Sequence, residues 1–124
     1  MRLEQIDHIA ITCQAPDAAK DWYIRVLGFE HVYAGRWGGI PIFLRLGSTY
    51  LALFPAQDAR QSSSAPRLEH FALRAATKSD FLEAQQHLSA LGIPYDFQDH
   101  GIAHSVHFAD PDGHKVEITT YDVG

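Results

Sequence analysis

Apolar and polar positions along the chain describe one arrangement of elements that occurs twice. Residues 6–11 alternate and are rich in β-branched side chains, which predicts a strand. Apolar residues then recur at helical spacing, with Pro16 at a favourable first helical position and Gly28 where a C-terminal cap belongs. Three further strands, separated by turns that contain glycine, are predicted near 29–33, 40–46 and 50–54.

The same order returns after a polar, serine-rich stretch at 56–67. Residues 68–73 repeat residues 6–11 position by position as apolar, acidic, His, apolar, Ala, apolar. A helix follows, with Thr77 or Ser79 as its cap. Its predicted buried face consists of four apolar residues, Phe81, Ala84, Leu88 and Leu91. The last strands are predicted near 94–98, 104–109 and 115–121, with the turn 110–113 before the final one.

This duplication predicts an α+β fold of two tandem βαβββ modules. The first module is expected at 4–55, the linker at 56–67 and the second module at 68–122. An unrelated α+β domain with a chance internal echo is the alternative, and the matching histidines weigh against it.

Composition narrows the class of protein. The 124 residues are 46% hydrophobic and carry a formal charge of −5, with Lys and Arg scattered singly, so no nucleic-acid partner is expected. No apolar stretch approaches the roughly 18 residues of a membrane span, and no secretory signal is seen, which favours a cytoplasmic protein without a membrane partner. The single cysteine, Cys13, is expected in the core.

Eight histidines are unusual for this length, and two of them fall at equivalent positions of the repeat. His8 and His70 each share a strand face with small residues, while bulky residues face the other way. Glu117 lies within the last predicted strand between apolar neighbours, where a buried carboxylate needs a partner. A divalent metal supplies that partner, and two imidazoles with one carboxylate suit iron(II), manganese or zinc. A hydrogen-bonded structural role is the alternative for each histidine taken alone.

Three segments resemble the vicinal oxygen chelate superfamily, which includes glyoxalases, extradiol dioxygenases, fosfomycin-modifying transferases and bleomycin-resistance proteins. They are Asp7-His8-Ile9-Ala10, then Trp22-Tyr23 with Leu27-Gly28-Phe29, and finally the run from Asp110 to Glu117. The resemblance implies that the two mixed sheets curve into a partly open barrel-like cup. It also implies that His8, His70 and Glu117 are the metal ligands.

Departures from the family pattern favour a dioxygenase-like enzyme of the extradiol type, an oxidoreductase. Glyoxalase-type members carry a fourth ligand at the end of the first module, where this chain has Leu51 and Ala52. Fosfomycin transferases use a threonine where this chain has Ala10. Ring-cleaving members keep a tyrosine ten residues before the final glutamate, where this chain has His107. His107 and His100 are therefore the candidate catalytic residues, as acid–base groups or ligands of a substrate oxygen.

The resemblance leaves alternatives open. Fe²⁺ is the favoured metal, with Mn²⁺, Ni²⁺ or Zn²⁺ as the others, and the partner is a small-molecule substrate. A glyoxalase-like lyase or isomerase is the second enzymatic candidate. A metal-free binding protein of the bleomycin-resistance type is the third, with a groove lined by aromatic residues such as Trp22, Tyr33, Trp37, Tyr50 and Phe54. A homodimer is expected, with each metal site built from one chain or from two.

Overall fold

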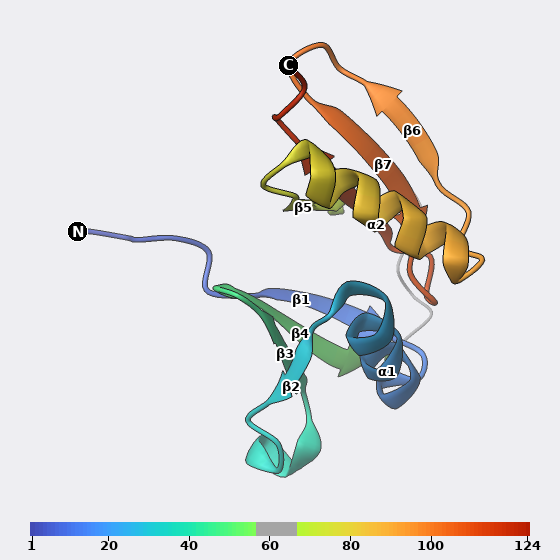
Figure 1. Cartoon of the computed structure of the whole chain (residues 1–124). Coiled ribbons are helices and arrows are strands. Elements are labelled where there is room, and N and C mark those ends of the chain that lie inside the picture. Colours follow the sequence, from blue (N-terminus) through green and yellow to red (C-terminus); the bar gives the residue numbers. More distant parts are fainter. Residues whose placement is uncertain (57–66) are drawn as a thin grey trace. The chain divides into compact units, whose positions relative to one another are not determined.

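The computed structural model describes residues 1–56 and 67–124 (Figure 1). The chain divides into two compact units, Met1–Ser63 and Ser64–Gly124. Each unit holds one four-stranded mixed sheet and one α-helix, which confirms the α+β class and the two βαβββ modules. The predicted linker, 56–67, lies outside the described residues except for its two end positions.

In the first unit the chain forms one edge strand of the sheet, then the other edge strand, and last the two central strands. Its strands lie in the order β1-β4-β3-β2, with β1 parallel to β4 and the other pairs antiparallel. A short 3₁₀ turn, Arg36–Gly39, separates β2 from β3. The elements are β1 (Ile9–Cys13), α1 (Pro16–Leu27), β2 (Glu30–Val32), β3 (Ile42–Leu46) and β4 (Thr49–Pro55).

The second unit repeats this topology with its own strands. The order is β5-β8-β7-β6, and β5 is again parallel to the last strand of the unit. The internal repeat of the sequence is therefore a repeat of strand order as well. The elements are β5 (Phe71–Arg74), α2 (Lys78–Ala90), β6 (Asp96–Asp99), β7 (His104–Ala109) and β8 (Lys115–Thr120).

Both helices begin where the sequence predicts, and α1 also ends where it predicts. Pro16 opens α1, and Gly28 closes it in the left-handed conformation at φ 77°, which a residue without Cβ adopts freely. Thr77 caps α2, where its hydroxyl oxygen accepts a hydrogen bond from the Asp80 N–H at 3.0 Å. Leu91 was expected on the buried face of this helix, but it lies past the last helical residue and is 40% exposed.

The apolar core of each unit lies between its helix and one face of its sheet. In the first unit the fully buried residues include Tyr23 of α1 and Leu51 and Leu53 of β4, and in the second they include Leu88 of α2 and Val106 and Val116 of the sheet. Cys13 is fully buried, as expected of a small core residue. The opposite face carries Ala10, Phe43 and Ala52 in the first sheet and Ala72, His107 and Glu117 in the second.

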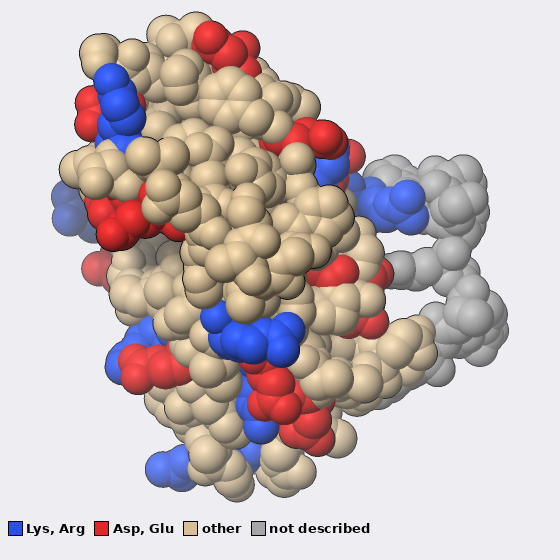
Figure 2. Space-filling view, turned by 45° about the vertical axis from the view of Figure 1, so that its right-hand side comes forward, with Lys and Arg blue, Asp and Glu red and all other residues tan. Residues whose placement is uncertain are grey.

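The surface gives two further observations. Figure 2 shows Lys and Arg side chains interspersed with Asp and Glu over the face that it draws. Among the described residues, no helix is both long enough and apolar enough to cross a membrane.

Candidate metal centre

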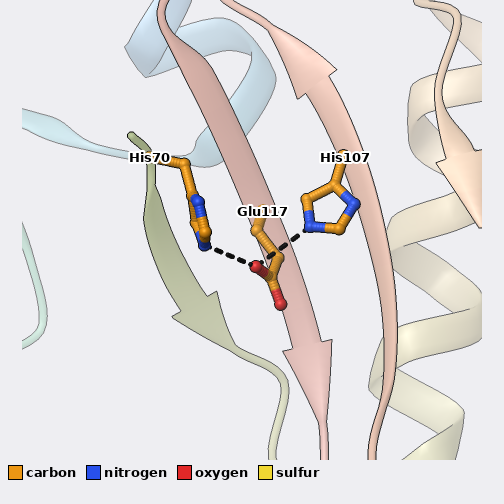
Figure 3. Close-up of side chains that lie close together, drawn as sticks. All are labelled: His70, His107 and Glu117. Atoms are coloured by element: carbon orange, nitrogen blue, oxygen red, sulfur yellow. Dashed lines mark ion pairs between the residues drawn. The ribbon is translucent and has the colours of Figure 1, made fainter. Parts of the chain in front are cut away.

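Three side chains of the second unit point toward one another from its sheet (Figure 3). The Nε2 atoms of His70 and His107 each lie 3.0 Å from the same carboxylate oxygen, Oε1 of Glu117. One ligand atom from each of the three residues lies within 4.8 Å of the others, and the described residues contain no second group of this kind. The sheet therefore presents two imidazoles and one carboxylate at a single point.

Strand pairing explains why these residues meet. Glu117 on β8 is the direct antiparallel partner of His107 on β7 and the direct parallel partner of Ala72 on β5. His70 lies two residues before Ala72, so its side chain projects from the same face of the sheet. Three adjacent strands thus each contribute one position to the site.

The turn between β7 and β8 fixes this pairing. Asp110 is buried, and its Oδ1 accepts hydrogen bonds from the N–H groups of Asp112 and His114, each at 2.9 Å. His107 and Glu117 are equally distant in sequence from Asp112, so a turn of this length places them opposite one another. A side chain buried in the turn therefore sets the register of the site.

The site is shielded on its core side and open on the other. The neighbours of Glu117 on β8, Val116 and Ile118, are buried on the helix-facing side. The side chains of Glu117 and His107 are 13% and 14% exposed, and that of His70 is 35% exposed. A carboxylate held in so little water needs a positive partner or several donors, and the two imidazole nitrogens are directed at it.

Glu69 lies beside His70 but is held by another residue. Lys115 Nζ donates a hydrogen bond to Glu69 Oε1 at 2.7 Å, and this bond lowers the pKa of the Glu69 carboxyl. His70 Nδ1 is 3.7 Å from that oxygen, is buried and makes no hydrogen bond. The donor atom of His70 that is engaged is therefore Nε2.

The three side chains fit a divalent metal. Imidazole nitrogen and carboxylate oxygen bind such ions at about 2.0–2.2 Å, so neighbouring ligands of a six-coordinate ion lie about 3.0 Å apart. The two nitrogen-to-oxygen distances around Glu117 Oε1 have this length. The donor chemistry suits iron(II), manganese, nickel or zinc, since these ions accept imidazole and carboxylate together.

His8 lies in the first unit, immediately before β1, and the predicted strand 6–11 therefore begins three residues late. Its Nδ1 is 2.9 Å from Asp7 Oδ2, which leaves Nε2 for another partner. The structure thus brings together two of the three ligands inferred from the sequence, His70 and Glu117, and adds His107 to them; His8 is described only within its own unit.

The other two histidines near β7 differ from His107. His100 is exposed in the turn after β6, where its backbone N–H donates to the Ala103 carbonyl at 2.8 Å. His104 lies near Asp99 at 3.4 Å and packs against Phe97. His104 and His107 therefore lie in different surroundings on the same strand.

The first unit has the same framework without the same donors. Its Ala52 pairs with Ala10 and with Phe43, just as Glu117 pairs with Ala72 and His107. Phe43 lies against His8 with ring centroids 5.2 Å apart, and His107 lies against His70 at 5.8 Å. The equivalents of His70, His107 and Glu117 are therefore His8, Phe43 and Ala52, and only the histidine is a metal-binding type.

Around His8, four aromatic rings form a continuous cluster, here called the aromatic patch: Tyr33, Trp37, Phe43 and Tyr50. Tyr33 and Trp37 are 52% and 58% exposed. Both have φ 56°, and they are the non-glycine residues with positive φ in the described part of the chain. A hydrogen bond with Tyr50 raises the pKa of Tyr33. Such strained backbone is concentrated at functional sites in proteins.

Comparisons with known proteins identify the family to which this framework belongs. Residues 5–118 match the model of the Glyoxalase/Bleomycin resistance protein/Dioxygenase superfamily. Biphenyl-2,3-diol 1,2-dioxygenase 2 of Rhodococcus globerulus is 30% identical over 90% of this chain, which spans only 60% of that protein's length. Metallothiol transferase FosB of Staphylococcus epidermidis is 25% identical, over 97% of this chain and 84% of that protein.

A solved structure agrees with these sequence relatives. Lactoylglutathione lyase from Agrobacterium tumefaciens superimposes with a TM-score of 0.77 at 27% identity, covering 97% of this chain and 96% of that one. The repeated βαβββ units, the histidine that begins each unit and the match over 5–118 agree with one another. The chain belongs to the Glyoxalase/Bleomycin resistance protein/Dioxygenase superfamily, the vicinal oxygen chelate fold.

Proposed function

We propose that this protein is a metal-dependent enzyme that binds a small substrate through two adjacent oxygens, with dioxygenase-like chemistry of the extradiol type. The convergence of His70 and His107 on one oxygen of Glu117 carries the proposal. Imidazoles and a carboxylate crowded onto one point, with little water around them, form a poor structural core but a good cation site.

The metal would be held by His70 and Glu117 of the second unit and by His8 of the first, with Fe²⁺ favoured over Mn²⁺, Ni²⁺ or Zn²⁺. When bound, such an ion supplies Lewis acidity and, in the case of iron, redox chemistry with dioxygen. His107 and His100 are the proposed acid–base groups, since imidazole exchanges protons near neutral pH.

Residues around the ligands hold them in place. His8 Nδ1–H donates a hydrogen bond to Asp7 Oδ2, and this tautomer presents Nε2 in the deprotonated form that metals bind. Lys115 binds Glu69, whose carboxylate oxygen lies 3.7 Å from the other ring nitrogen of His70, Nδ1. The contact with Asp7 orients the His8 imidazole before any ligand arrives, which lowers the ordering cost of binding.

The aromatic patch suits a planar, aromatic substrate. Its rings run from Phe43, which touches His8, to the exposed ring of Trp37, so the flat ring of a substrate could stack on them. The 30% identical relative is by its name a dioxygenase of a biphenyl diol, which supports an aromatic diol here.

Two other functions have an observation in their favour. The similarity to a lactoylglutathione lyase structure supports a lyase or isomerase that needs the metal only as a Lewis acid. The exposed aromatic patch alone would suit metal-free binding of a drug-like molecule. We also infer a cytoplasmic homodimer, in which one site takes residues from one chain or from two.

Metal content and dioxygen uptake test the proposal. Tag-free protein, prepared anaerobically, is expected to hold close to one metal per chain, and a His70→Ala/Glu117→Gln variant is expected to hold none. Iron-loaded protein should consume dioxygen with catechol-type diols. Metal binding without uptake would move the function to the lyase class, and absence of metal binding in the unaltered protein, even after reconstitution, would leave the metal-free binding protein.

A further inference from the structure

We propose that His107 is itself a metal ligand, so that the second unit alone supplies three protein donors: His70, His107 and Glu117. The inference rests on the proposed metal site, and it replaces the acid–base role of His107 with a ligating one. It also makes β7 a metal-binding strand, although the sequence assigned ligands only to the strands that begin and end the unit.

The first argument is the equivalence of His70 and His107 around Glu117. Both imidazoles direct Nε2 to the same oxygen at the same distance, 3.0 Å. By these distances, His107 is as well placed to bind a metal as His70. An ion placed to bind His70 and Glu117 has the His107 nitrogen within the 4.8 Å that spans the whole group.

Proton balance gives the second argument. In the absence of a metal, two imidazoles can bind one carboxylate oxygen only if each carries its proton on Nε2. A divalent cation takes the place of both protons at Nε2 and satisfies all three side chains at once, while each neutral imidazole then carries its proton on Nδ1. His107 is only 14% exposed, so little water is present to take the place of either partner.

The first unit provides an internal comparison. At the position equivalent to His107 it has Phe43, a ring of similar shape that packs on His8 in the same way. At the position equivalent to Glu117 it has Ala52. Packing on the neighbouring histidine therefore needs only a flat ring, and an imidazole occurs in the unit that also has the carboxylate.

The number of bound imidazoles bears on the chemistry. An ion with three protein donors keeps room for a second small reactant beside a substrate that binds through two oxygens, whereas a six-coordinate ion with four donors does not. If His8 and His107 both bind, the lyase or isomerase function gains support over the dioxygenase.

The test is a count of imidazole ligands in tag-free protein loaded with Co²⁺. Each histidine that binds Co²⁺ through Nε2 contributes one strongly shifted, exchangeable N–H proton resonance. His107→Phe, which copies Phe43, should lose one such resonance, and its affinity for Co²⁺ should fall by more than about 100-fold, beyond the usual effect of a residue behind the ligands. His104→Phe, on the same strand, should keep every resonance.

A second variant distinguishes the loss of a metal ligand from the loss of the fold. His107→Ala opens a space in which added imidazole should restore the lost resonance and the affinity. Equal counts in the unaltered protein and in His107→Phe would overturn the inference while leaving the metal site intact. Failure of the unaltered protein to bind Co²⁺ would instead remove the proposed metal site and this inference together.

Discussion

His107 and Glu117 are direct partners in the antiparallel pair of β7 and β8, and their side chains meet at 3.0 Å on the open face of the sheet. Both residues belong to regular strands whose opposite face packs into the core. Sites built on such elements hold their geometry more closely than sites on loops. The donors are therefore arranged by the fold before a ligand is present.

Glu117→Gln should abolish stabilisation by metal. A bound ion stabilises the native state by about 2.7 kcal/mol when its concentration is 100 times its dissociation constant, and Gln removes the charge that binds it. Thermal melts with and without chelator measure this difference. Asp99→Asn, which alters the carboxylate near His104, is the control and should keep the metal-dependent shift; an equal shift in Glu117→Gln would contradict the prediction.

Trp37→Gly should weaken binding of an aromatic diol without destabilising the fold. The backbone of Trp37 is in the left-handed region, where a side chain costs about 1–2 kcal/mol, and more than half of the residue is exposed. We expect the dissociation constant for catechol to rise about tenfold or more, since an aromatic pair contributes about 0.5–1.5 kcal/mol beyond its buried area. The melting temperature should stay equal or rise.

Calorimetry with metal-loaded protein measures this affinity, and Phe97→Leu is the control because Phe97 is an exposed aromatic residue outside the aromatic patch. An unchanged affinity in Trp37→Gly would remove the aromatic patch from the substrate site.

Gly28→Ala should lower the free energy of unfolding by about 1–2 kcal/mol. Gly28 ends α1 at φ 77°, and an L-residue pays for that conformation even though nothing crowds its Cβ. Urea titration followed by circular dichroism measures the change. Asp21→Ala on the exposed side of the same helix should stay within about 0.5 kcal/mol, and equal effects would argue against the conformational explanation.

Leu88→Ala and Leu91→Ala should differ although both leucines come from the apolar pattern of α2. Leu88 is almost fully buried and its truncation should cost about 2–5 kcal/mol, whereas Leu91 is 40% exposed and should cost less than about 1 kcal/mol. Denaturant midpoints of the two variants give the comparison. A larger loss for Leu91→Ala would mean that this residue is covered in solution, for example at a dimer contact.

Mixing two inactive variants tests whether a site is shared between chains. If His8 comes from one chain and Glu117 from the other, His8→Ala and Glu117→Ala chains form heterodimers with one intact site of two. Random exchange then restores about one quarter of the original activity. If each site lies within one chain, every site in the mixture carries a substitution and no activity returns. A mixture of each variant with itself is the control.

Local features of the fold were predictable because each depends on a few neighbouring residues. Gly28 and Thr77 end and begin their helices as expected, and the repeat of His-apolar-Ala at His8 and His70 correctly predicts two like units. Strand starts were less accurate: residues 6–8 continue the alternation, but β1 begins at Ile9, where Leu51 of β4 becomes its partner. Alternation alone does not say where pairing with the neighbouring strand begins.

The candidate site was predictable in part for the same reason. Placing His70 and Glu117 on like faces needs only the period of a strand. The contact between His107 and Glu117 depends on the register across the turn, which buried Asp110 sets through two backbone N–H groups. The sequence shows that turn and the ten-residue separation, but the pairing that makes them partners is a property of the folded sheet.

The pairing of Ala10 with Ala52 has a consequence for how this chain can change. A repeated unit that has alanine at the position of the Glu117 carboxylate does not need to preserve the surroundings of one. We expect substitutions on that half, at Phe43 or along 33–37, to alter the proposed substrate contacts, whereas His8 is the one residue of that half that the proposed metal site requires. Selection for a new substrate should therefore accumulate changes before residue 56, apart from His8, and leave the hairpin of β7 and β8 unchanged.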